Sequence, residues 1–261
     1  MSPRSFLQPV DKLVCCTLQA VDGEIGAGEE IYFDDATWAV RYLVVDTGRW
    51  LRGRRVLISP VAVDEVREHE KTIPVELTRA QIENSPPFDA DRPLSRPYEV
   101  KYYEYYDWPV YWEDDRQSGA PPPSSVPPET ELLAGGSGQT RRKKMHLHRA
   151  AQINGCVIVS HDGAIATVRD AIVDSRYWVI RYLKIEIRNG RPGRQVLIST
   201  GWIERVNWID RVINVGLTSA AITTAPGFDP SRDISRDYEA QLFRHYGRRA
   251  YWQRNNGTAT G

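Results

Sequence analysis

The chain contains two copies of one long segment, separated by 140 residues. Residues 22–112 align without gaps to residues 162–252 and are identical at 32 of 91 positions. A period of this length, present twice, gives each copy enough residues for a core, so the sequence predicts a duplicated domain and not a solenoid. We expect each copy to fold alone. The strongest matches pair Asp22-Gly23 with Asp162-Gly163, Trp38-x-x-Arg41-Tyr42-Leu43 with Trp178-x-x-Arg181-Tyr182-Leu183, and Val56-Leu57-Ile58-Ser59 with Val196-Leu197-Ile198-Ser199.

The repeat divides the chain into a first domain over residues 1–116, a linker over 117–140 and a second domain over 141–261. The linker is rich in proline and glycine, a composition that favours an extended or flexible tether over a packed element. It contains Pro121-Pro122-Pro123, Pro127-Pro128 and Gly135-Gly136.

Charge is distributed unevenly over these three segments. The whole chain has 34 Lys and Arg and 34 Asp and Glu, a formal net charge of zero. The first domain carries −8, the linker −2 and the second domain +10. Two hypotheses follow: the two copies attract one another as an intramolecular pseudo-dimer, or each has specialised for a different surface. A homo-oligomer is a further alternative.

Location and redox state can be predicted from what the sequence lacks. No run approaches the roughly 20 apolar residues of a membrane helix, and the N-terminus has no signal-peptide pattern, so a cytoplasmic protein is expected. Three cysteines, Cys15, Cys16 and Cys156, have no metal-ligand spacing and are predicted to be buried free thiols.

Each copy is predicted to be mainly β. In the first copy, residues 13–20, 38–46, 54–60 and 72–77 are short runs rich in Val, Ile, Leu and aromatic residues. Asp22-Gly23 is a favourable hairpin turn, because both residues tolerate positive φ. Several short strands in so few residues favour a small antiparallel barrel, in which closure protects the strand edges.

Two short helices are predicted to follow the strands. Thr78-x-x-Gln81 forms a capping box, and the helix it begins should end before Pro86. A second helix is expected to start near Ser95, a favourable N-cap.

Aromatic residues recur along this second helix. Tyr98, Tyr102 and Tyr106 would share one helix face, which we expect to dock on the barrel; copy two has Tyr238, Leu242 and Tyr246. A stacking platform for single-stranded nucleic acid is the alternative, but acidic residues surround the aromatics. Trp112 and Trp252 are expected to be apolar plugs that close each domain.

One longer motif resembles a known family. Asp34-Asp35-x-x-Trp38-x-Val40-Arg41-Tyr42-Leu43-Val44-Val45-Asp46, followed by Arg55-Val56-Leu57-Ile58-Ser59-Pro60, resembles the PRC-barrel domain, and copy two repeats its core as Asp174-x-x-x-Trp178-x-Ile180-Arg181-Tyr182-Leu183. The resemblance covers roughly residues 10–77 and 150–217, and the helical extension is similar to that of tandem bacterial PRC-barrel proteins.

The resemblance carries expectations about function. The family is named for the cytoplasmic domain of the photosynthetic reaction centre H-subunit, and it also supplies the C-terminal domain of a ribosome maturation factor. It implies two tandem PRC-type barrels and a noncatalytic module that engages a protein complex, at the cytoplasmic face of the membrane. Association with the ribosome or RNA is the alternative. This chain lacks the membrane helix of the first protein and the separate N-terminal barrel of the second.

Residues for catalysis do not form a recognisable pattern. Neither a phosphate-binding loop nor a zinc or Ser/His/Asp spacing is present. The histidines are not repeated at the offset of 140; they are His69, His146, His148, His161 and His245. We therefore predict no catalytic residue, no metal site and no cofactor.

Arg41 and Arg181 are the shared residues with the clearest physical requirement. On a strand each falls on the apolar side, where an unpaired guanidinium is costly. The shared Asp34 and Asp174 are the predicted partners in structural ion pairs; in the alternative, each arginine receives a carboxylate from a binding partner.

A basic cluster precedes the second copy. It comprises Arg141, Arg142, Lys143, Lys144 and Arg149. Such a run is usually solvated, but in a segment of charge +10 it is a candidate contact for an anionic membrane surface or, less favoured, for RNA phosphates.

Overall fold

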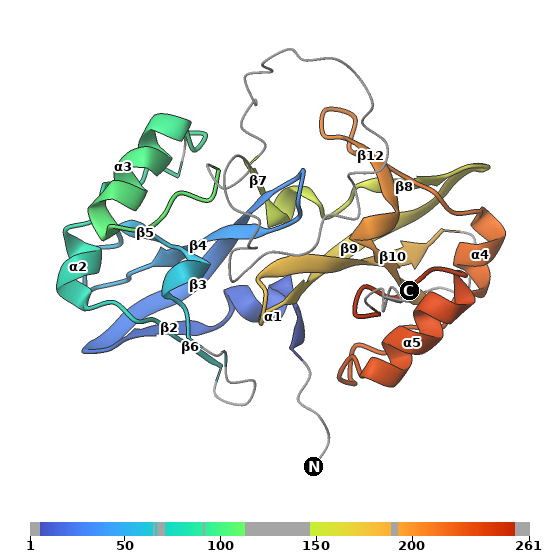
Figure 1. Cartoon of the computed structure of the whole chain (residues 1–261), viewed down its shortest axis with the longest axis horizontal. Coiled ribbons are helices and arrows are strands. Elements are labelled where there is room, and N and C mark those ends of the chain that lie inside the picture. Colours follow the sequence, from blue (N-terminus) through green and yellow to red (C-terminus); the bar gives the residue numbers. More distant parts are fainter. Residues whose placement is uncertain are drawn as a thin grey trace, which may run out of the picture.

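The computed structural model describes residues 6–64, 66, 71–90, 92–112, 147–188 and 193–253. Within them the chain is mainly β, with two sheets, and each sheet is followed in sequence by two short helices. The two repeats lie side by side, with α2 and α3 at one end of the molecule and α4 and α5 at the other (Figure 1). The predicted fold class is confirmed, whereas the exact domain boundaries stay a prediction.

The first sheet belongs to the first repeat. Its strands are ordered β5 (Arg55–Ile58), β4 (Val40–Asp46), β3 (Gly23–Asp34), β2 (Thr17–Ala20) and β6 (Thr72–Pro74). Neighbours are antiparallel except for β2 and β6, which are parallel. A wholly antiparallel sheet was therefore the wrong expectation, because the chain returns to β6 through the 3-10 helix η1 (Pro60–Ala62) and not by a tight hairpin.

The second sheet repeats this order and adds one strand. Its strands are β11 (Gln195–Ser199), β10 (Val179–Ile187), β9 (Gly163–Asp174), β8 (Val157–Ser160), β13 (Val212–Val215) and β12 (Ile203–Asn207). Strands β8 and β13 are again parallel. The 3-10 helix η5 (Thr200–Trp202) precedes β12.

The helices begin where their capping residues predict. Helix α2 (Arg79–Glu83) has the complete Thr78–Gln81 capping box, and α3 (Arg96–Tyr106) follows Ser95. In the second repeat, α4 (Ser219–Thr224) follows Thr218 and α5 (Arg236–His245) follows Ser235. The Asp22 turn does more than reverse the chain, since its Oδ1 accepts the backbone N–H of Arg79 at 2.8 Å and so ties the β2–β3 hairpin to α2.

The N-terminal segment of each repeat pairs with the sheet of the other. Strand β1 (Leu7–Pro9) is antiparallel to β9, and β7 (Leu147–Arg149) is antiparallel to β3. Short helices follow these strands, α1 (Val10–Val14) and the 3-10 helix η4 (Ala150–Gln152). The exchange is reciprocal, so each sheet is completed by the other repeat.

The two repeats also meet directly at their β3–β4 and β9–β10 turns. Ala39 and Val179 form a bridge. The backbone N–H of Val40 donates to the carbonyl of Trp178 at 2.7 Å, and that of Ile180 donates to the carbonyl of Trp38 at 2.9 Å. Backbone hydrogen bonds therefore join the repeats at the centre of the molecule.

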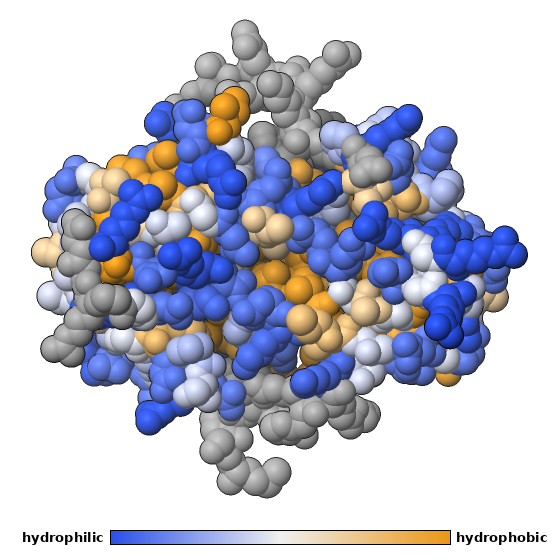
Figure 2. All heavy atoms as spheres, turned by 180° about the vertical axis from the view of Figure 1, so that it is seen from behind, coloured by the Kyte–Doolittle hydropathy of each residue, from blue (hydrophilic) through white to orange (hydrophobic). Residues whose placement is uncertain are grey.

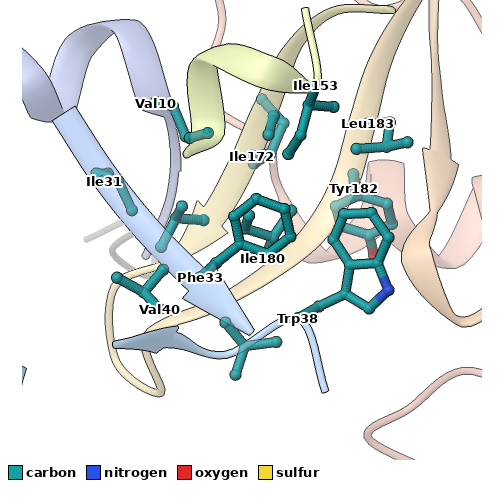
Figure 3. Close-up of a cluster of buried hydrophobic side chains, with 14 of the residues drawn as sticks. Val10, Ile31, Phe33, Trp38, Val40, Ile153, Ile172, Ile180, Tyr182 and Leu183 are labelled. Atoms are coloured by element: carbon teal, nitrogen blue, oxygen red, sulfur yellow. The ribbon is translucent and has the colours of Figure 1, made fainter. Parts of the chain in front are cut away.

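One apolar core extends through both repeats. Figure 3 shows side chains of the first repeat, among them Phe33 and Trp38, packed with Ile172 and Ile180 of the second. The expectation that each copy folds alone is not supported, because separation of the repeats would expose these side chains and leave two strand edges unpaired. A second apolar cluster, around Tyr42 and Tyr102, has its buried residues in the first repeat, and Leu147 of β7 packs against it.

The molecular surface is mostly polar. Seen from behind, hydrophilic side chains cover most of the face, and apolar ones gather near its middle (Figure 2). In the described part of the chain, helices long and apolar enough to cross a membrane are absent. All three cysteines are free; Cys16 and Cys156 are buried as predicted, whereas Cys15 is exposed, so the prediction was wrong for that residue.

Candidate functional site

Each repeat holds a buried glutamate surrounded by hydrogen-bond donors. Glu99 of α3 has no exposed surface. One oxygen, Oε1, accepts the hydroxyls of Tyr42 of β4 at 2.9 Å and of Tyr111 at 2.7 Å. Nη1 of Arg96 lies 3.0 Å from the other oxygen, Oε2. The network therefore ties α3 and the residues after it to the sheet.

The second repeat reproduces this network. Glu239 of α5 accepts the hydroxyls of Tyr182 at 2.6 Å and Tyr251 at 2.8 Å, and Nη1 of Arg236 lies 2.9 Å from its Oε2. Burial raises the pKa of both glutamates, and the hydrogen bonds and arginines oppose that rise. The pKa of Tyr182 is also raised, first by burial and then by the Glu239 charge. These groups pair with one another, so they hold helix to sheet.

The structure brings each predicted arginine to its aspartate. Nη2 of Arg41 lies 3.8 Å from Oδ2 of Asp34, and Nε of Arg181 lies 3.4 Å from Oδ2 of Asp174. Each guanidinium also covers a tyrosine ring that was not part of the prediction, with 3.8 Å from Arg41 Cζ to the Tyr111 ring centroid. The second repeat has the same contact, 4.3 Å, between Arg181 and Tyr251. The arginines therefore join the β3–β4 and β9–β10 turns to the glutamate networks.

The predicted tryptophans take two different positions. Trp38 and Trp178 lie in the turns where the repeats meet, buried and with positive φ of 59° and 51°. Such a φ is unusual for a large side chain and is held here by the backbone bonds between the repeats. Trp112 and Trp252 instead lie at the ends of the two helical extensions, half-buried, each beneath a guanidinium at 4.2 Å, from Arg96 and Arg236 respectively.

The predicted tyrosine stripe packs inward. Tyr98 and Tyr238 are half-buried, and their hydroxyls donate to the carbonyls of Pro86 and Pro226. Tyr102 is fully buried and donates to the carbonyl of Leu57 at 2.9 Å. Tyr106 stacks on Trp108, with ring centroids 4.5 Å apart. The aromatics therefore cover the sheet.

A polar cluster spans the two repeats beside β7. Asp35 of the first repeat accepts Nε1–H of Trp208 at 2.6 Å, and its Oδ2 lies 3.3 Å from Nε2 of His148. The His148 and Trp208 rings stack with centroids 4.1 Å apart. These contacts fix the exchanged strand, and sequence reasoning missed them because no repeated pattern marks them.

The basic cluster is only partly placed. Arg141, Arg142, Lys143, Lys144 and the linker lie outside the described residues. Arg149 lies on β7, where its Nε donates to the Tyr32 hydroxyl at 2.9 Å and its Nη2 to the carbonyl of Ala90. It is therefore engaged in the contact between the repeats.

The potential metal ligands of the described residues do not cluster. In this part of the chain, no three His, Cys, Asp or Glu side chains gather closely enough to hold a metal ion. Sequence reasoning also missed Glu99 and Glu239 as the centres of the networks. The signal that could have found them was the identity, in both copies, of every glutamate, tyrosine and arginine involved.

Comparison with known proteins supports the resemblance of the first repeat to the PRC-barrel domain. Residues 19–82 match the family model of the PRC-barrel domain. This segment includes β3, β4, β5 and β6 and ends within α2. No curated protein matches the chain. The chain therefore contains a PRC-barrel domain at residues 19–82.

Proposed function

We propose that the chain is a tandem PRC-barrel protein and a noncatalytic binding and assembly module that engages a protein complex. The observation that carries this proposal is that the ionisable residues shared by both repeats have structural roles. In each repeat, the buried glutamate, Glu99 or Glu239, contacts two tyrosines and one arginine of the same repeat. These contacts attach the helix to the sheet. The repeated chemistry is thus architectural, and the repeats differ in surface charge.

The second repeat is proposed as another PRC-barrel domain on the strength of its strand order. Strands β8 to β11 and β13 follow the arrangement of β2 to β6, including the one parallel pair. By analogy with the reaction-centre relative, the complex is proposed to lie at the cytoplasmic membrane face, with the basic segment near anionic lipid.

Affinity purification of the full chain from its native cells, at about 150 mM salt, tests the protein-complex proposal. We expect a defined set of proteins to be retained, because contacts that are partly apolar survive screening. Recovery of RNA in place of proteins, lost steeply as salt rises, would instead establish the alternative of a ribosome- or RNA-associated factor, which the charge of +10 on residues 141–261 favours.

Sedimentation with vesicles tests the membrane part separately. The full chain should sediment with phosphatidylglycerol vesicles and not with phosphatidylcholine vesicles, at about 1 kcal/mol per basic residue. A variant with Arg141, Arg142, Lys143 and Lys144 changed to alanine should remain in the supernatant. Equal sedimentation of the variant contradicts a role for this cluster.

A further inference from the structure

At one position of the sheets, the first repeat lacks a lysine that the second repeat has. In the second repeat, Lys184 of β10 lies opposite Asp170 of β9, and its Nζ is 3.3 Å from Oδ2 of Asp170. Both side chains are buried, and Asp11 of α1 lies 3.9 Å from the same ammonium. In the first repeat, the corresponding pair is Val44 opposite Glu30. The carboxylate is kept, but β4 supplies no cation.

A pocket of about 240 Å³ lies at this position of the first repeat. Its lining includes Val44, Glu30 and Tyr32 of the sheet, Phe88 of the loop between α2 and α3, and Arg149 of β7. In the second repeat, a lysine side chain replaces Val44 and reaches the carboxylate. The pocket thus coincides with the position from which the lysine is missing.

The Glu30 carboxylate has one oxygen without a hydrogen bond. Its Oε1 accepts the backbone N–H groups of Ile31 at 2.9 Å and Ala151 at 3.3 Å. Among the residues that the structure describes, no donor reaches Oε2. Burial raises the pKa of Glu30 above the ordinary value, and the two backbone hydrogen bonds and the nearby charge of Arg149 oppose this rise. Glu30 is half-buried, and a cation against Oε2 would add to the partial compensation of its charge by Arg149.

The two arginines that line the pocket are directed to other acceptors. Arg149 donates to Tyr32 and to the Ala90 carbonyl. Arg55 forms a two-fold hydrogen bond with Glu29, at 2.5 and 2.7 Å. In the described part of the chain, neither guanidinium forms an ion pair with Glu30 as Lys184 does with Asp170, although the Arg149 charge lowers the Glu30 pKa.

We propose that this pocket binds a primary ammonium group carried on an alkyl chain. The ammonium lies against Glu30, as Lys184 lies against Asp170, and the alkyl chain packs over Val44. The Tyr32 and Phe88 rings, with centroids 6.2 Å apart, add aromatic surface that favours a cation. A free alkylamine and a lysine side chain of a partner protein present the same chemistry. The proposal goes beyond the proposed function and is testable without any partner.

Titration of the full chain with n-butylamine and with Nα-acetyl-lysine methylamide tests this site. We expect saturable NMR shifts of the Ile31 and Ala151 amides, with Kd on the order of 1 mM. The uncharged n-pentanol should give none. Tighter binding of the lysine derivative assigns the site to a partner's lysine, and tighter binding of butylamine assigns it to a free amine. Absence of saturable shifts with both amines overturns the proposal.

Three variants localise the binding. Val44→Lys supplies the missing ammonium from within, and Glu30→Gln removes the carboxylate charge; each should weaken amine binding by about tenfold or more. Glu24→Gln, a matched change on an exposed part of β3, should leave Kd unchanged. Amine binding by Glu30→Gln as tight as that of the unmodified chain would refute the site, whether or not Val44→Lys folds.

Discussion

At the scale of single residues, each repeat has one buried carboxylate that accepts two tyrosine hydroxyls. Glu99 and Glu239 lie at most 2% exposed, and each accepts two tyrosine hydroxyls and faces one arginine. In Glu99, Oε1 accepts both tyrosine hydroxyls, whereas the buried Oε2 accepts no hydrogen bond and faces only the Arg96 guanidinium, so the loss of one hydroxyl donor should weaken the whole network.

Removal of one tyrosine hydroxyl should measure this dependence. Tyr42→Phe leaves the Glu99 carboxylate with one hydroxyl donor, and we expect the free energy of unfolding to fall by about 1–3 kcal/mol. Urea unfolding provides the measurement. Tyr105→Phe is the control, because Tyr105 is 40% exposed and donates only to a backbone carbonyl, and its cost should be about 0.5 kcal/mol or less. Equal effects would contradict the role assigned to Glu99.

Asp170 should make stability depend on pH. Burial, and next the charge of Asp11, raise the pKa of Asp170 to about 6 from 3.8, while Lys184 opposes the shift. The folded state therefore binds more protons than the unfolded state between about pH 4 and 6. This contribution to stability is fully present below the pKa of Asp170 in the unfolded state, 3.8, and is lost as the pH rises through its pKa in the folded state, about 6.

Asp170→Asn should flatten that dependence. Between pH 7 and pH 4, the unmodified chain should gain about 1–2 kcal/mol relative to the variant, because only the former takes up a proton on Asp170. Urea unfolding at each pH measures the difference. Parallel pH profiles for the two proteins would show that Asp170 does not titrate in this range.

At the scale of elements, β3 and β4 depend on a close backbone approach. Gly26 has φ of 153°, and a Cβ there would lie 2.0 Å from the carbonyl oxygen of Asp46. Hairpin turns, helix caps and several strands could be predicted from local pattern, since turn and capping residues act over few positions. The whole of β3 was missed, because Gly26, Gly28 and its charged residues lower the apparent strand propensity.

Gly26→Ala should therefore separate these strands. The positive φ of Gly26 disfavours alanine, and the added methyl group would clash with the backbone of Asp46. We therefore expect the free energy of unfolding to fall by about 3 kcal/mol or more. The matched control is Gly48→Ala, at φ of 53° with no neighbour within 4 Å of the added carbon, which should cost about 1 kcal/mol. Thermal unfolding followed by circular dichroism compares the two. A smaller loss for Gly26→Ala than for Gly48→Ala would contradict the close packing of β3 on β4.

At the scale of the whole molecule, the two repeats form one unit. Exchange of β1 and β7, the backbone bonds at Ala39 and Val179, and the shared core all join them. The repeat and the fold class were predictable from the sequence, as were the Arg41–Asp34 and Arg181–Asp174 pairs, because they are identical in both copies. The exchange of β1 and β7 between the repeats was not predictable, because a three-residue strand has little sequence pattern and the opposite repeat sets its register. The charge difference suggested that the halves attract by charge; the contacts between them combine the shared core and the backbone bonds with the Asp11–Lys184 and Asp35–His148 ion pairs.

Cutting the linker tests this unity most directly. A specific protease site placed within residues 117–140 of the full chain allows cleavage after folding, and gel filtration then reports whether the halves stay together. Because apolar contacts and exchanged strands hold them, we predict that both fragments elute as one species at about 0.1 M and at about 1 M salt. Elution of two separate, folded halves, at either salt concentration, would contradict the account.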